Sequence, residues 1–199
     1  MPEIIPNAGN IQKSVMNTEL AIYKKILGEA AIISSDRIFT NSGKEHAAIA
    51  MSVMYNSTRQ KMQLVVDSFN GDVSNDDNYR IALEKCLNRG IKADIIILNE
   101  PNIKSAGFKA YYDFRSTHPK QVSIRKATEE TKTILNESKS ISHISVAETY
   151  NIALFDNDKY RFEIIPSKYI ALLSFNDPDL VAKYQKVFNS AFPTAKELA

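Results

Sequence analysis

A strand–helix–strand pattern in the first half of the chain restricts its fold more than any other feature. The run "MQLVVDSF" (62–69) predicts a strand, and "IKADIIILNEP" (91–101) is mostly apolar and β-branched, as in a strand that is covered on both faces. Between them, "NDDNYRIALEKCLNRG" (75–90) has acids in its first turn, apolar residues at helical spacing and Gly90 at its end. The sequence therefore predicts a βαβ unit and an α/β fold.

Further segments extend this pattern. We expect an irregular arm over 1–13, then a helix, a strand within 31–40, and a second helix capped by Asn41 and Ser42. The second half is rich in candidate strands, namely 143–148, 151–156, 159–165 and 169–175. A last helix follows, with Asp177 as N-cap and Pro178 at its first position.

The expected organisation is an N-terminal arm and helix over 1–31, a domain over 32–192 and a tail over 193–199. With 199 residues, 44% of them hydrophobic, the chain can fill one sizeable core. Its net charge of +2 does not by itself indicate a polyanionic partner. The single cysteine, Cys86, excludes an intramolecular disulfide and a cysteine metal cluster, and no apolar run is long enough for a membrane span. We expect a cytoplasmic protein without a metal or cofactor.

Charged residues near the C-terminus are the strongest candidates for chemistry. Asp156 and Asp158 flank a turn in "NIALFDNDKYRFE" (151–163), and Arg161 and Glu163 must point to the same face of the following strand. An Arg fork beside a carboxylate is suited to holding a phosphate, although a cross-strand salt bridge on an exposed face explains the same pattern.

The ordered set of segments resembles one module of the phospholipase D superfamily. The resemblance covers roughly residues 32–192, from "FTNSGKEHAAIAMSVMYNSTRQKMQLVVDSF" through "ALFDNDKYRFE" to "ALLSFNDPDLVAKYQKVFNSAF". It implies a mixed sheet with helices on both faces and a catalytic H-x-K-x-x-x-x-D motif on a late strand. In that family His attacks phosphorus, Lys neutralises the phosphate oxygens, and a second module supplies another His. The Ser and Asn of an "S.N" strand end, here Ser174 and Asn176, help to hold the phosphate.

The catalytic motif is degenerate in this chain. With the motif's Asp on Asp158, Asn151 stands in the His position and Ala153 in the Lys position; with its Asp on Asp156, Thr149 and Asn151 stand there. Neither Asn nor Ala can replace those groups, so catalysis by the family mechanism should fail by many orders of magnitude. His143, on the preceding candidate strand, is the nearest replacement nucleophile.

Three hypotheses follow. The first is a catalytically degenerate phospholipase D-like module that binds a phosphodiester ligand, with nucleic acid favoured, or pairs with itself or an active partner. Its candidate phosphate-binding residues are Asn151, Asp158, Arg161, Glu163, Ser174 and Asn176. The second is a phosphodiesterase or nuclease that uses His143 or an acidic metal site at Asp156, Asp158 and Glu163. The third is a protein-interaction subunit that uses the aromatic residues Phe108, Tyr111, Tyr112 and Phe114.

Overall fold

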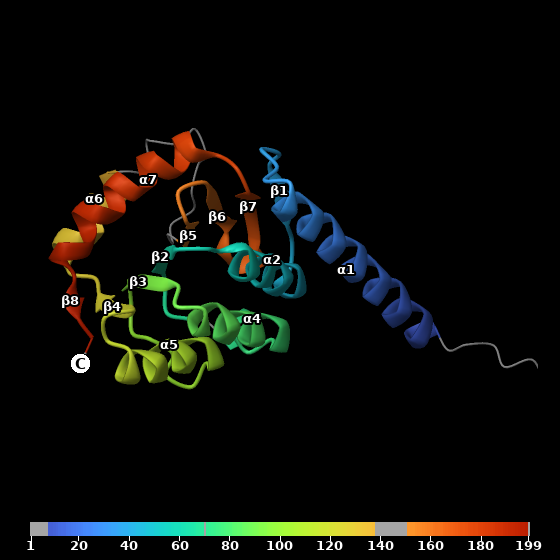
Figure 1. Cartoon of the computed structure of the whole chain (residues 1–199). Coiled ribbons are helices and arrows are strands. Elements are labelled where there is room, and N and C mark those ends of the chain that lie inside the picture. Colours follow the sequence, from blue (N-terminus) through green and yellow to red (C-terminus); the bar gives the residue numbers. More distant parts are fainter. Residues whose placement is uncertain (1–7, 70, 138–150, 199) are drawn as a thin grey trace, which may run out of the picture.

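The computed structural model describes residues 8–69, 71–137 and 151–198 (Figure 1). The helices are α1 (Ala8–Ile32), α2 (Lys44–Ser57), α3 (Gly71–Ser74), α4 (Asp77–Asn88), α5 (Ala106–Thr117), α6 (Glu129–Glu137) and α7 (Pro178–Ala191). The strands are β1 (Phe39–Asn41), β2 (Lys61–Val66), β3 (Lys92–Ile97), β4 (Val122–Lys126), β5 (Ile152–Phe155), β6 (Lys159–Ile165), β7 (Ile170–Ser174) and β8 (Lys196–Glu197).

The strands of the described residues form one mixed, eight-stranded sheet in the order β1-β7-β6-β5-β2-β3-β4-β8. The pairs β2–β3 and β3–β4 are parallel, which confirms the predicted βαβ unit. All other neighbours are antiparallel, including the β5–β6 hairpin and the pair β2–β5 that joins the two halves.

Two hydrophobic layers cover the faces of the sheet. Helices α2, α4 and α5 lie on one face, and α6 and α7 lie on the other (Figure 1). Because successive side chains of a strand point to opposite faces of the sheet, one strand contributes residues to both layers. In β2, for example, Leu64 belongs to the first layer and Val65 to the second. The expected fold, a mixed sheet with helices on both faces, is confirmed.

The N-terminal region differs from expectation in two ways. The helix begins at Ala8 rather than after residue 13, since both prolines precede that point and each added helical residue gains a hydrogen bond. The strand expected within 31–40 is only the short β1, which pairs with β7. No strand of the described residues pairs with the segment before it, and Ile33 and Ile38 are exposed.

The start of α2 also differs. Its N-cap is Gly43, at φ 85°, with no side-chain cap, and not Asn41 or Ser42. Asn41 lies in β1, where its side chain is used in a tertiary contact described below. The other caps are as predicted: Asp177 accepts from the N–H of Leu180, Pro178 begins α7, and Gly90 has φ 83° after α4.

The segment expected as a tail contributes β8, which pairs with β4. Among the described residues, no helix is both long and apolar enough to span a membrane.

Candidate functional site

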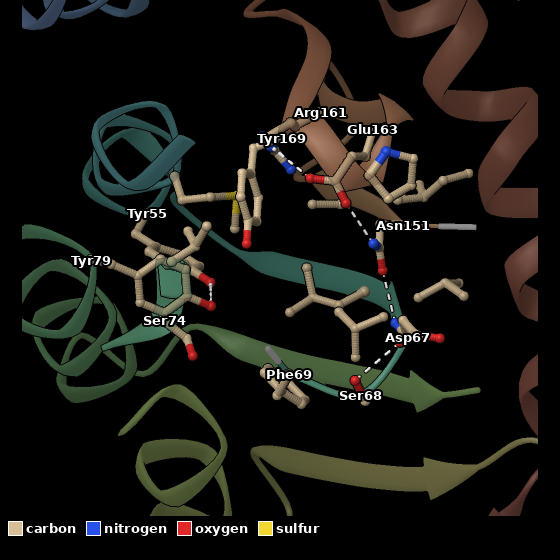
Figure 2. A pocket seen from close by; sticks show the side chains of 18 residues that line it. Tyr55, Asp67, Ser68, Phe69, Ser74, Tyr79, Asn151, Arg161, Glu163 and Tyr169 are labelled. Atoms are coloured by element: carbon tan, nitrogen blue, oxygen red, sulfur yellow. Dashed lines mark hydrogen bonds and ion pairs between the residues drawn. The ribbon is translucent and has the colours of Figure 1, made fainter. Parts of the chain in front are cut away.

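A cavity of about 190 Å³ lies between the sheet and the helices of the first layer (Figure 2). It is formed where the carboxyl end of β2 meets the start of β5, because these strands are antiparallel and Val65 pairs with Ile152. Its wall includes Met51, Tyr55, Leu64, Phe69, Val73, Ser74, Tyr79, Ala153 and Pro166, and its polar residues are Asp67, Ser68, Asn151, Arg161, Glu163 and Tyr169.

Asn151 is fixed at the edge of this cavity by both ends of its amide. Its Oδ1 accepts a hydrogen bond from the backbone N–H of Asp67 at 2.7 Å, and its Nδ2 donates to Glu163 Oε2 at 2.5 Å. The backbone N–H of Glu163 also donates to the carbonyl of Asn151, at 3.0 Å. The amide therefore joins β2 to β6 and has its orientation set by a backbone donor on one side and a carboxylate on the other.

Arg161 continues the same line of contacts. Its Nη2 donates to Glu163 Oε1 at 3.3 Å, and its Nε donates to Asn41 Oδ1 at 3.2 Å. The Asn41 amide in turn donates to the carbonyl of Tyr169. Figure 2 shows Arg161, Glu163 and Asn151 in one row along the cavity. These hydrogen bonds form a continuous chain from the end of β2 to the start of β7.

The Arg161–Glu163 pair is almost fully buried, with 9% of each side chain exposed. Removing one partner of such a pair leaves an uncompensated charge in a medium of low dielectric constant. The two charges cancel, so this wall of the cavity is close to neutral, and a phosphate would have to compete with Glu163 for Arg161.

Three tyrosines are linked by hydrogen bonds, and two of them, Tyr55 and Tyr79, line the cavity across from Asn151 (Figure 2). Tyr111 Oη donates to Tyr55 Oη at 3.2 Å, and Tyr55 Oη donates to Tyr79 Oη at 2.8 Å. Burial raises the pKa of Tyr79 to about 12, although the bond from Tyr55 and the charge of Arg161 act to lower it. Tyr79 is therefore protonated at neutral pH. Its hydroxyl accepts a hydrogen bond from Tyr55 and can still donate its own hydrogen.

The six predicted phosphate-binding residues divide into two groups. Asn151, Arg161 and Glu163 meet at the cavity, as described above. Asp158, Ser174 and Asn176 lie at the turn end of the hairpin, since Ser174 pairs with Tyr160 and the N–H of Asp177 donates to the carbonyl of Asp158 at 2.7 Å. The register of β6 and β7 therefore separates residues that the sequence pattern had grouped together.

The acids of the predicted metal site are also separated. Asp156 and Asp158 both bind Lys159 Nζ, at 2.8 Å each, while Glu163 binds Asn151 and Arg161 near the other end of the hairpin. No group of three His, Cys, Asp or Glu side chains suited to a metal ion occurs in the part of the chain that the structure describes. Asp156 instead accepts from the backbone N–H groups of Arg59, Gln60 and Lys61 and fixes the start of β2.

Two other predictions have different outcomes. His143, the alternative nucleophile, lies outside the described residues. In the aromatic stretch of α5, Phe108 and Tyr111 are buried in the core and Phe114 packs against it, while Tyr112 is 40% exposed. The stretch is therefore mainly a core element.

Sequence reasoning missed several residues of the cavity, namely Asp67, Ser68, Phe69, Tyr79 and Tyr169, and also Asn41, which binds Arg161. A signal existed for Asp67 and Ser68, because polar residues directly after a buried parallel strand lie at the edge where α/β sheets bind ligands. No local pattern marks Asn41 or Tyr169, since each reaches the site only through the pairing of β1 with β7.

The architecture is that of a phospholipase D-like α/β module. No protein-family model matches the sequence, and no curated protein sequence matches it. Among solved structures, it is similar to Nuc from Salmonella typhimurium, a phospholipase D family member, with a TM-score of 0.55 and 12% identity over 81% of this chain and 99% of Nuc. It is also similar to NucT from Helicobacter pylori, with a TM-score of 0.53 and 12% identity over 81% of this chain and 99% of NucT.

A third similar structure is TrmBL2, an archaeal chromatin protein with a novel mode of DNA binding, with a TM-score of 0.54 and 14% identity. The match covers 96% of this chain and 66% of TrmBL2. Because only about 4% of the 199 residues lie outside it, the match must include most of α1. At these identities the likeness establishes the fold.

Proposed function

We propose that this chain is a catalytically degenerate phospholipase D-like module that binds a phosphodiester ligand, with nucleic acid favoured, and does not cut it. The observation that carries the proposal is the hydrogen bonding of the Asn151 side chain. Asn151 stands where the family motif has a catalytic group, and its amide is held between the N–H of Asp67 and the Glu163 carboxylate. An amide so held cannot attack phosphorus or neutralise phosphate charge.

Arg161 supports a binding role for the same place. Among the described residues, its Nε and Nη2 are bound to Asn41 and Glu163, which leaves Nη1 as the atom through which it can meet a phosphate oxygen at the cavity. The adjacent carboxylate weakens that contact but does not remove it. Such a site favours reversible binding of a phosphate within a polymer over tight capture of an isolated dianion.

Nucleic acid is the favoured phosphodiester because one structural neighbour, TrmBL2, is a chromatin protein that binds DNA. Single-stranded DNA, duplex DNA and RNA of equal length should each be tested by gel retardation over a range of salt concentrations. We expect retardation that weakens as salt rises, with no shortening of the labelled strand in Mg²⁺, Mn²⁺ or EDTA. Arg161→Gln should weaken retention, and Arg115→Gln on α5 serves as the control for loss of an arginine elsewhere.

Cleavage would overturn the proposal. Strand cutting that is lost in His143→Ala would establish the phosphodiesterase or nuclease of the second hypothesis. Absence of retardation for all three polymers at low salt would remove nucleic acid as the ligand.

Pairing with a second copy or another protein is a second candidate role, and a separate observation favours it. Of the large apolar side chains exposed among the described residues, six lie on α1 or the segment that follows it, namely Met16, Ile22, Ile26, Ile32, Ile33 and Ile38. Exposed apolar patches mark interaction surfaces. Sedimentation of the intact chain and of Ile22→Glu tests this role: a dimer that the substitution dissociates supports it, and a monomer at all concentrations excludes self-pairing.

A further inference from the structure

We infer that the cavity beside Arg161 receives one uncharged, planar heteroaromatic group of nucleobase size, taken from the bound strand. This inference rests on the proposed function, and it adds which part of the ligand enters the cavity. Four properties of the cavity support it: its size, the distribution of polar groups on its wall, its charge, and the backbone of two of its aromatic residues.

The size excludes a long ligand. At about 190 Å³ the cavity is smaller than the roughly 300–1,000 Å³ of sites for drug-sized molecules. A stretch of sugar–phosphate backbone cannot enter such a space, whereas a single ring system can. The phosphates of a strand would remain at the mouth of the cavity, and Arg161, which is 7% exposed, lines its wall.

Polar groups lie on two opposite sides of the cavity. Arg161, Glu163 and Asn151 offer donors and acceptors in a row from neighbouring strands, and Figure 2 shows Tyr55 and Tyr79 across the view from Asn151. Most of the remaining wall is apolar, with Met51, Leu64, Phe69, Val73 and Ala153. A nucleobase has two apolar faces and carries donors and acceptors on more than one edge, so it matches this wall. A sugar carries hydroxyls around its ring and would leave several of them against apolar side chains.

The charge of the cavity also selects against an anion. The Arg161 and Glu163 charges cancel, and the nearby Asp67 adds a carboxylate at the edge. Tyr79 is 5% exposed. Its hydroxyl accepts a hydrogen bond from Tyr55, so its own hydrogen can be donated to a ligand acceptor. A ring carbonyl or ring nitrogen supplies such an acceptor without bringing a charge into the cavity.

Two aromatic residues of the wall have an unusual backbone. Phe69 and Tyr169 have φ values of 59° and 53°, in the left-handed region that side chains with a Cβ rarely adopt. Both line the cavity, one after β2 and one before β7. Strained non-glycine residues gather at ligand sites, where the surrounding structure holds them. Here the strain places an aromatic ring of each segment at the cavity, as a base-stacking site requires.

The test uses nucleosides, which carry a base without a phosphate. Adenosine, guanosine, cytidine and uridine are each titrated into the intact chain by calorimetry, with glucose and inorganic phosphate as comparison ligands. We expect at least one nucleoside to bind with a Kd below about 1 mM, and glucose and phosphate to bind more weakly. Val73→Phe should fill the cavity and weaken nucleoside binding about tenfold or more, because a packed space resists added volume. Tyr79→Phe should weaken it about three- to tenfold by removing one hydrogen bond.

Two matched variants separate loss of the cavity from loss of the fold. Val187 is a partly buried valine of α7 that packs on the other face of the sheet, and Val187→Phe should leave nucleoside binding unchanged. Tyr160 is a buried tyrosine on that face whose hydroxyl has no partner among the described residues, and Tyr160→Phe is the control for Tyr79→Phe.

The outcomes also separate this inference from the proposed function. Retardation of nucleic acid without nucleoside binding would overturn the inference and leave the proposed function standing. Binding of glucose in preference to every nucleoside, or equal loss in Val73→Phe and Val187→Phe, would also overturn it. Nucleoside binding without retardation of any polymer would keep the cavity assignment and reject binding to a strand.

Discussion

At the scale of single residues, the site is governed by how its charges are paired. Arg161 and Glu163 are both buried and are held by Asn41 and Asn151. Asp156 and Lys159 form a second buried pair, at 2.8 Å, near the turn of the same hairpin. One hairpin thus carries two compensated pairs, one facing the cavity and one fixing the start of β2.

Removing the charge of Glu163 should have opposite effects on stability and on binding. In Glu163→Gln, Arg161 loses its counter-charge, so the free energy of unfolding should fall by about 3 kcal/mol. The same change frees the guanidinium, so affinity for single-stranded DNA should rise. Urea denaturation and gel retardation measure the two effects.

The double variant Arg161→Gln, Glu163→Gln is the control for this prediction. It should recover part of the lost stability and should lose the gain in DNA affinity, because neither charge remains. If the loss of stability in the double variant equals the sum of the losses in the two single variants, the pair is not coupled.

Two aspartates have pKa values shifted in opposite directions, so they should have opposite effects on the free energy of unfolding at pH 7. Burial acts to raise the pKa of Asp156, but hydrogen bonds from Lys159 and from the N–H groups of Gln60 and Arg59 outweigh it and leave the pKa below its ordinary value. A lowered pKa gives stability above the ordinary carboxyl pKa of about 4, and that stability is lost as pH falls through the folded-state value. Asp156→Asn should therefore lower the free energy of unfolding at pH 7 and flatten its fall in acid.

Asp94 provides the matched comparison. Burial raises its pKa, against the charges of Lys61, Lys92 and Arg125. A carboxyl with a raised pKa costs stability once the pH exceeds its ordinary value. Asp94→Asn should therefore raise the free energy of unfolding at pH 7. Urea denaturation between pH 3 and pH 7 checks both variants, and equal effects at pH 7 would contradict the assignment.

At the scale of elements, the caps and register decide where side chains arrive at the site. The β6–β7 register shifts between Glu163 and Ile165, next to the cavity, as bulges often do beside sites. The helix α4, which supplies Tyr79, is capped by Asp76, whose side chain accepts from the N–H groups of Asn78 and Tyr79. The N-cap therefore fixes the first turn of α4 and the residue that faces the cavity.

Loss of this cap should be visible in stability. Asp76→Ala should lower the free energy of unfolding by about 1 kcal/mol, because two N–H groups of the first turn lose their acceptor. The neighbouring Asp77 binds Arg80 on the surface, so Asp77→Ala should change the free energy of unfolding by less than about 0.5 kcal/mol. Thermal or urea unfolding of the two variants compares them, and equal losses would mean that the cap is not the cause.

At the scale of the whole molecule, α1 belongs to the same core as the sheet. Its N-terminal part extends beyond α2 in Figure 1, but its C-terminal half packs on α2 through Leu27 and Ala30. Leu27 is fully buried, whereas Ile22 on the same helix is 54% exposed. The helix thus has one face in the core and another on the surface.

Substitutions on the two faces should differ in their effect. Leu27→Ala should lower the free energy of unfolding by about 2–5 kcal/mol through the cavity it leaves. Ile22→Ala should change it by no more than about 0.5 kcal/mol, because its side chain is largely in solvent. Chemical denaturation measures both, and a small effect of Leu27→Ala would mean that α1 is not part of the cooperative unit.

The sequence by itself determined the βαβ unit, the β5–β6 hairpin, the N-cap of α7 and the fold class. These features depend on hydrophobic period, turn residues and cap residues, which are local. It also determined that Arg161 and Glu163 share a face, because alternation along a strand is a property of the backbone.

Only the tertiary structure decided which residues meet. Asn41, Asp67 and Asn151 join Arg161 and Glu163 because β1, β2, β5 and β6 are brought together by strand order, and no local pattern encodes that order. The same register moved Asp158, Ser174 and Asn176 to the other end of the hairpin. Asn41 does not cap α2 as predicted, because its side chain accepts a hydrogen bond from Arg161 instead. A buried guanidinium requires an acceptor, whereas an exposed helix end can be satisfied by water.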